Sequence, residues 1–101
     1  MIARIWHGYT ELQNADAYEN LLKTEIFSWI GSKNIRGYKG IQLLRRQSAD
    51  ETEFITIMLF EDLQAVIEFA DEDYETAVVL PHAKALLKRF DAKSQHYEVV
   101  A

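Results

Sequence analysis

Apolar and polar residues alternate along two neighbouring segments in the middle of the chain, and this alternation predicts a β-hairpin. Residues 37–47 have the pattern of one strand, residues 48–51 are typical of a turn, and residues 52–60 have the pattern of the returning strand. Residues 61–70 follow directly with the apolar spacing of a short helix. Both faces of the returning strand are apolar, one through Phe54, Met58 and Phe60 and the other through Ile55, Ile57 and Leu59.

The segments on either side of the hairpin complete the order of a ferredoxin-like domain. Residues 2–10 alternate as a first strand, and apolar residues at helical spacing predict a helix over 18–30. A further helix over 81–90 and a final strand over 94–100 are expected after the hairpin unit and its helix. The order strand, helix, strand, strand, helix, strand indicates an α+β fold with a four-stranded antiparallel sheet. No repeat or linker interrupts residues 1–101, which are therefore expected to form a single domain.

The first and third predicted strands carry large apolar side chains on both of their faces. The helices of a chain of 101 residues cover one face of such a sheet, and no element is left to cover the other. An uncovered apolar sheet face is larger than the apolar patch that monomers usually expose. The pattern therefore predicts a homodimer in which a second copy of the chain covers this face.

Composition and charge exclude several classes of function. The chain has 16 acidic and 11 basic residues, a formal net charge of −5, and scattered basic residues, so nucleic-acid binding is not expected. It has no cysteine, which excludes disulfides and thiolate metal sites and is typical of a reducing compartment. No segment has the pattern of a signal peptide or a membrane span, so we expect a cytoplasmic protein that does not bind membranes.

His7, in the middle of the first strand, is the strongest candidate for a catalytic residue. Strand alternation puts it on the same face as Ala3 and Ile5, which we assign to the helix-covered side of the sheet. An imidazole in that position could accept a proton from a bound ligand near neutral pH. The competing interpretation is a structural histidine with one hydrogen-bonded ring nitrogen.

Aromatic side chains and a second histidine are candidates for binding a small ligand. Trp6, Phe69 and Tyr74 could stack on a flat aromatic compound, although aromatic residues at such spacing also serve as plain core. His82 begins the last predicted helix, either at the mouth of a cleft between helices and sheet or facing solvent. The histidines lack the short spacing of a metal site, and the acidic residues at 71–75 lack the pattern of a calcium loop, so no metal is expected.

Residues 35–70, together with the segments 3–8 and 69–75, resemble the antibiotic biosynthesis monooxygenase-like family of dimeric α+β barrels. The similarity extends through residues 90–91 and 96–99 and thus spans nearly the whole chain. The resemblance implies dimers that pair sheet to sheet, and a ligand pocket between the helices and the sheet of each subunit. Some members of this family oxygenate polyketide-like phenols with molecular oxygen and without metal or flavin, and the substrate anion supplies the electrons.

A second branch of the superfamily degrades haem with an Asn in the first strand, a Trp after the third strand and a His in the following helix. The corresponding positions here hold His7, Phe69 and His82, so only the histidine matches and haem degradation is disfavoured. The resemblance favours cofactor-independent oxygenation of a small aromatic or quinol-like compound. In this reading His7 is the base and the pocket is lined by Trp6, Phe69, Tyr74 and His82. The alternative function is a stress-related or small-molecule-binding barrel without catalysis.

Overall fold

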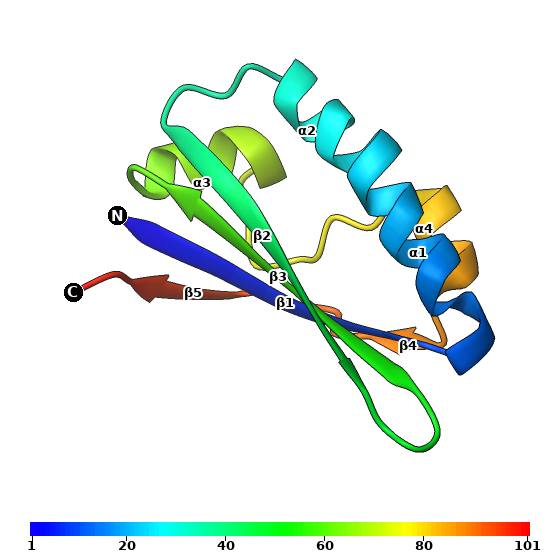
Figure 1. Ribbon diagram of the computed structural model, residues 1–101. Helices are drawn as coiled ribbons and strands as arrows, with labels where there is room; N and C mark the ends of the chain where they lie inside the picture. The colour runs from blue at the N-terminus through cyan, green and yellow to red at the C-terminus, as the bar shows by residue number, and fades with distance from the viewer.

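One antiparallel sheet of five strands runs through the computed structural model, which describes all 101 residues of the chain (Figure 1). The strands are β1 (Ile2–Thr10), β2 (Tyr38–Gln47), β3 (Thr52–Phe60), β4 (Arg89–Phe90) and β5 (Gln95–Glu98). They follow the order β2-β3-β1-β4, and β5 pairs with the same edge of β1 as β4 does. This arrangement is a ferredoxin-like α+β fold, which confirms the predicted class.

The helices all lie on one face of the sheet (Figure 1). They are a 3-10 turn (Leu12–Asn14), α1 (Ala15–Leu21), a π-helical turn (Leu22–Ile26), α2 (Phe27–Ser32), α3 (Leu63–Ala70) and α4 (Pro81–Leu86). The segments from α1 to α2 form one continuous rod that includes the helix predicted over 18–30. The Asp62 carboxylate caps α3 by accepting a hydrogen bond from the N–H of Ala65 at 3.0 Å. None of the helices is long and apolar enough to cross a membrane.

The edge strand beside β1 differs from the single strand predicted over 94–100, because it is broken into β4 and β5. Phe90 pairs with Gly8, and Gln95 pairs with Ile5. Five residue steps of the edge therefore span three steps of β1, and the two extra residues (5 − 3) bulge out of the ladder. The sheet consequently has five strands where the pattern predicted four.

The last helix also ends earlier than the predicted range 81–90, because α4 stops at Leu86. Leu87 is already extended, and the N–H of Lys88 donates a hydrogen bond to the carbonyl of Tyr9 at 2.7 Å. The helix thus ends four residues before the predicted end at Phe90, and the chain has joined the sheet by Lys88. Pairing with β1 replaces the last turn of the expected helix.

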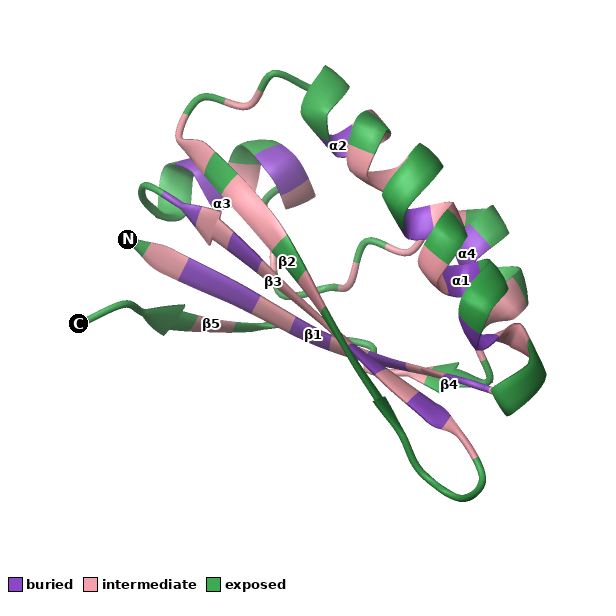
Figure 2. Ribbon diagram, viewed as in Figure 1, coloured by how far each residue is buried: buried purple, intermediate pink, exposed green.

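The hydrophobic core lies on the helix-covered face of the sheet, and buried and half-buried positions follow one another along β1 and β3 (Figure 2). The predicted set Phe54, Met58 and Phe60 points to this face, and each of these residues is at most 5% exposed. The core has two parts. The Phe69 cluster contains Phe69 and other residues of α3, whereas the Tyr18 cluster contains Tyr18 of α1, together with residues of α4.

The opposite side of the sheet, here termed the open face, has no helix on it (Figure 1). The second apolar set of β3, which includes Ile55 and Ile57, points to this side and is only half-buried. Leu44, the cross-strand partner of Ile55, is 44% exposed, and Tyr97, the partner of Ala3, is 55% exposed. An apolar sheet face is therefore left uncovered within a single chain, as the alternation predicts.

Candidate functional site

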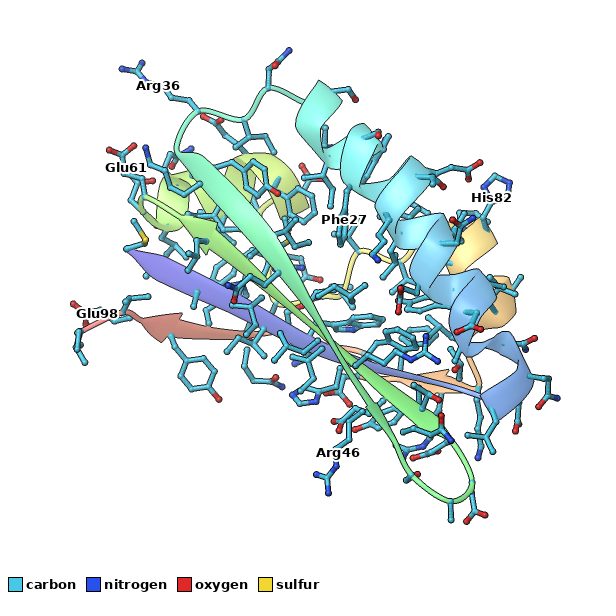
Figure 3. All side chains as sticks on the ribbon, viewed as in Figure 1. Phe27, Arg36, Arg46, Glu61, His82 and Glu98 are labelled. Carbon is cyan, nitrogen blue, oxygen red and sulfur yellow. The ribbon has the colours of Figure 1, made fainter.

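A cavity of about 60 Å3 lies between the sheet and the helices, where the Phe69 cluster and the Tyr18 cluster meet. Of its 17 lining residues 14 are hydrophobic, and none is acidic. Phe27 projects from the helical rod into the space between helices and sheet (Figure 3). Rings from four different elements form much of the wall: Trp6, Tyr18, Phe27, Trp29 and Phe69. Such a wall suits a small, flat and mainly apolar ligand.

Trp6 reaches the cavity because its neighbour on the same strand face, Gly8, has no side chain. A Cβ atom at Gly8 would lie 2.7 Å from Cη2 of the Trp6 ring, which is too close for any real contact. The indole Nε1–H donates a hydrogen bond to the carbonyl of Asp91 at 2.7 Å. Asp91 belongs to the bulge between β4 and β5. The break in the edge strand therefore helps to fix one wall of the cavity.

Arg4 is the only charged side chain in the cavity wall. The residue is 3% exposed, yet it forms no ion pair with any carboxylate. Its guanidinium donates hydrogen bonds to the carbonyl of Tyr74, to the carbonyl of Thr76 at 3.2 Å and to Nε2 of His96 at 2.9 Å. It also lies 5.5 Å from the centroid of the Phe69 ring. Burial lowers the pKa of Arg4 to about 10, so the side chain stays protonated at neutral pH.

His96 of β5 is held in its neutral form beside Arg4. Because a guanidinium can only donate, Nε2 of His96 must accept, and the ring proton is therefore assigned to Nδ1. Burial and the positive charge of Arg4 lower the pKa of His96, and the charge of Glu75 opposes them. The imidazole also packs edge-on against Tyr74, with ring centroids 5.1 Å apart. The neutral His96 ring therefore orients the guanidinium of Arg4 and leaves its positive charge uncompensated.

Besides Arg4, the wall contains the polar residues Thr56 and Ser94, and Tyr18 and Lys33 also bear on the cavity. Tyr18 lines it and is 1% exposed, and its hydroxyl makes no hydrogen bond within the chain. Burial raises the pKa of Tyr18, so the hydroxyl remains a neutral donor. The Lys33 ammonium lies 4.7 Å from the centroid of Trp29 and 5.8 Å from that of Phe69. Although the chain has a net charge of −5, the charges at this cavity are positive, which favours an anionic ligand.

Of the five predicted site residues, the structure brings Trp6 and Phe69 into the cavity wall. Tyr74 is half-buried outside this wall and lines a separate shallow hollow with His96. His82 is exposed on α4, and its ring points away from the sheet (Figure 3). The cavity therefore uses the predicted aromatic side chains of the sheet and of α3 but not the predicted histidines.

The predicted placement of His7 on the helix-covered face is wrong. β1 turns Arg4 and Trp6 toward the helices, whereas His7 points to the open face, where its Nδ1 lies 2.9 Å from the Glu53 carboxylate. Alternation separates the two faces of a strand, but it does not say which face the helices cover when both are apolar. An imidazole on the open face does not reach a ligand in the cavity. A catalytic role of His7 thus stays a prediction that the cavity does not support.

Sequence reasoning missed Arg4 and Tyr18 as site residues. A signal for Arg4 was present, because it lies in a strand between Ile2 and Trp6 on one face, and arginine is almost never buried unless it is paired. Tyr18 had only helical spacing, which predicts a core residue equally well. Only packing shows that its hydroxyl is left without a partner. No group of three or more His, Asp and Glu side chains is arranged to hold a metal ion.

Comparison with solved structures finds SnoaB, a cofactor-independent oxygenase from Streptomyces nogalater. The TM-score is 0.56 at 18% sequence identity, and the match covers 99% of this chain and 94% of the SnoaB chain. The two chains share their fold. No protein-family model matches the chain, and no curated protein matches it in sequence.

Proposed function

We propose that this protein is a cofactor-independent monooxygenase that acts on a small aromatic or quinol-like compound. The observation that carries the proposal is the aromatic-walled cavity with one buried, protonated guanidinium and no acidic residue. Such a site favours a flat ligand that carries negative charge. The shared fold with SnoaB, a cofactor-independent oxygenase, supports the same chemistry.

A phenolic substrate supplies the electrons for this reaction. Oxidation of a phenol by molecular oxygen to a quinone and water balances without an external reductant: one oxygen atom becomes the new ring carbonyl, and the other leaves in water with two substrate hydrogens. The ionised substrate is the electron donor. The charge of Arg4 stabilises negative charge in the cavity, and the apolar wall keeps bulk water away from the reacting ring.

Binding without turnover is the second candidate function, and a specific observation favours it. None of the residues lining the cavity is His, Asp or Glu, the side chains that most often act as general bases. Haem degradation is disfavoured, since Phe69 stands where the resemblance expects a Trp and His82 points away from the cavity.

Oxygen uptake separates the two candidates. Protein treated with a chelator is mixed with phenol or hydroquinone, and oxygen consumption and quinone absorbance are recorded. A monooxygenase consumes one oxygen molecule per quinone formed and places one labelled atom from ¹⁸O₂ in the product. A bound phenol that consumes no oxygen above the rate without protein contradicts the proposal and supports a binding protein.

We further propose that the chain forms a homodimer through the open face. Leu44 and Tyr97 on this face are exposed, and the neighbouring apolar residues of β3 are only half-buried. A second copy would remove this surface from water at roughly 25 cal/mol per Å2 of apolar area. Light scattering should give about twice the chain mass of 11.7 kDa, and a soluble species of 11.7 kDa at micromolar concentration contradicts the dimer.

A further inference from the structure

We infer that the ligand of the cavity is a small aromatic carboxylic acid whose carboxylate binds Arg4. The inference deepens the proposed function, since it names the class of substrate, and it rests on that function only in placing an aromatic compound in the cavity. Three features of the site carry it: the unused donors of Arg4, the charge balance of the wall and the free hydroxyl of Tyr18.

The donors of Arg4 are only partly used by the protein. A guanidinium has five N–H groups. Two on Nη1 donate to Tyr74 and His96, and one on Nη2 donates to Thr76. The groups left without a partner are Nε–H and the second N–H of Nη2. These two nitrogens are bonded to the same carbon atom, Cζ. Two adjacent donors match the two oxygens of a carboxylate, whereas the single oxygen of a phenolate fits such a pair less well.

The charge balance of the wall points in the same direction. Burying a guanidinium costs several kcal/mol unless an anion compensates it, and the chain offers Arg4 only carbonyls, a neutral imidazole and an aromatic ring. The lining contains no acidic residue, and Lys33 adds a second positive charge over Phe69. A bound carboxylate would supply the missing negative charge. The carboxylates of the open face do not supply this negative charge, because Arg4 lines the cavity on the other side of the sheet.

Tyr18 brings a hydroxyl-bearing side chain to a cavity wall whose other polar residues are Arg4, Thr56 and Ser94. Tyr18 belongs to one core cluster, while Arg4 stacks on Phe69 of the other, and the cavity lies between the two clusters. A ring with a carboxylate at one end and a hydroxyl at the other would satisfy both groups. At about 60 Å3 the cavity is smaller than an apolar cavity of roughly 150 Å3 that binds benzene, so a single ring enters only if side chains of the wall move, and a polycyclic compound is excluded.

The test compares 4-hydroxybenzoate with its neutral analogue 4-hydroxybenzamide by isothermal titration calorimetry at neutral pH. The two probes have the same ring and hydroxyl and differ in the group that would meet Arg4. We expect the carboxylate to bind at least roughly tenfold more tightly, the scale of one charge-assisted hydrogen bond. Equal affinity, tighter binding of the amide, or no binding of either probe at millimolar concentration overturns the inference.

Variants assign the preference to the cavity. Arg4→Gln should remove the preference for the carboxylate, whereas Arg36→Gln, which removes the same charge from an exposed loop residue, should keep it (Figure 3). Tyr18→Phe should weaken the binding of 4-hydroxybenzoate but not the binding of benzoate. A folded Arg4→Gln protein that keeps the preference contradicts the inference. If Arg4→Gln does not fold, the comparison of the two probes on the wild-type protein and the Tyr18→Phe result still decide.

The proposed function and this inference fail in different ways. Carboxylate-selective binding without oxygen uptake from any phenolic acid removes the oxygenase and keeps the carboxylate site. Oxygen uptake with neutral phenols, together with equal binding of the acid and the amide, keeps the oxygenase and removes the carboxylate site.

Discussion

The two faces of the sheet are similarly apolar in sequence and differ in what covers them. On the helix-covered face Phe54 and Phe60 are completely buried, whereas on the open face Ile55 and Ile57 of the same strand keep part of their surface exposed. The difference arises because every helix packs on one side (Figure 1). One face therefore forms a closed core with a cavity, and the other is a surface suited to a partner.

The two faces also differ in whether their charged side chains are paired, and this difference indicates where a ligand binds. On the open face the Glu53 carboxylate accepts hydrogen bonds from His7 at 2.9 Å and from Tyr9 at 3.4 Å. Arg89 pairs with Glu51 at 2.6 Å near the same end of the sheet. On the covered face Arg4 is more deeply buried than any of these groups and has no carboxylate. A charge that the chain leaves unpaired in its interior indicates a ligand more strongly than paired charges at the surface do.

The largest expected effect tests whether side chains are packed more tightly on the helix-covered face than on the open face. Phe54→Ala should lower the free energy of unfolding by about 3 to 5 kcal/mol, since it empties a fully buried ring position. Its neighbour Ile55→Ala, on the open face, should cost roughly 1 to 2 kcal/mol. Urea denaturation followed by circular dichroism measures both. Equal costs would mean that the open face is as tightly packed as the core.

A charge on the open face tests whether this face is an interface. Ile57→Glu should dissociate the proposed dimer, because it buries a carboxylate without a partner between two sheets. Light scattering should then report the chain mass of 11.7 kDa. Gln64→Glu adds the same charge on α3, on the helix side, and should leave the mass unchanged. A variant Ile57→Glu that keeps the wild-type mass places the contact elsewhere.

Crowding of the cavity wall tests the role of Gly8. Gly8→Ala should destabilise the protein by about 1 to 3 kcal/mol and weaken binding of aromatic ligands, because the new Cβ forces the Trp6 ring to move. Gly31→Ala is the matched control, since a Cβ there meets nothing within 4 Å. In that helical position alanine should be neutral or stabilising by up to roughly 1 kcal/mol. Thermal unfolding and titration with 4-hydroxybenzoate report the two effects.

Removal of His7 tests which face carries the chemistry. His7→Ala breaks a partly exposed pair with Glu53, so we expect at most about 1 kcal/mol of lost stability and unchanged ligand affinity. Calorimetric titration beside urea denaturation checks both. A loss of roughly 100-fold in turnover of a phenol by a folded dimer would instead restore His7 as the base and move the reaction to the open face.

The smallest expected effect is a pH dependence that arises beside Arg4. The pKa of His96 is lower in the folded protein than its ordinary value of about 6.5, so the unfolded chain binds more protons at low pH. Stability should be complete above pH of about 6.5 and should fall as the pH drops through the lowered pKa. Urea midpoints measured at neutral and acidic pH report this dependence. His96→Asn should flatten it, whereas His82→Asn, at an exposed position, should not.

The hairpin and the order of elements were predictable, while the edge strand and the last helix were not. The predicted strands 37–47 and 52–60 agree with β2 and β3 to within one residue, because local alternation and a short turn define a hairpin. The bulge between β4 and β5 depends on pairing with β1, which is distant in sequence. Helical spacing alone likewise gave no sign that the chain would join the sheet at Lys88.

The residues of the candidate site were likewise only partly predictable from the sequence. Trp6 and Phe69 were predicted because large aromatic residues at regular spacing are visible in any sequence. His7 was assigned to the wrong face, and Arg4 was overlooked, for one shared reason: they lie on opposite faces of the same strand, and both faces are apolar. Choosing between the faces requires knowing where the helices pack.

The amino-acid sequence by itself determined the ferredoxin-like order, the alternation of each strand and the presence of two apolar sheet faces, since all of these follow from local periodicity. Only the tertiary structure decided which face the helices cover, where the edge strand breaks and which polar groups are left without partners. These features depend on contacts between residues far apart in the chain, such as Arg4 with Thr76 and His96. A pattern along the chain records which side of a strand a residue occupies, whereas burial and pairing arise only when the layers pack.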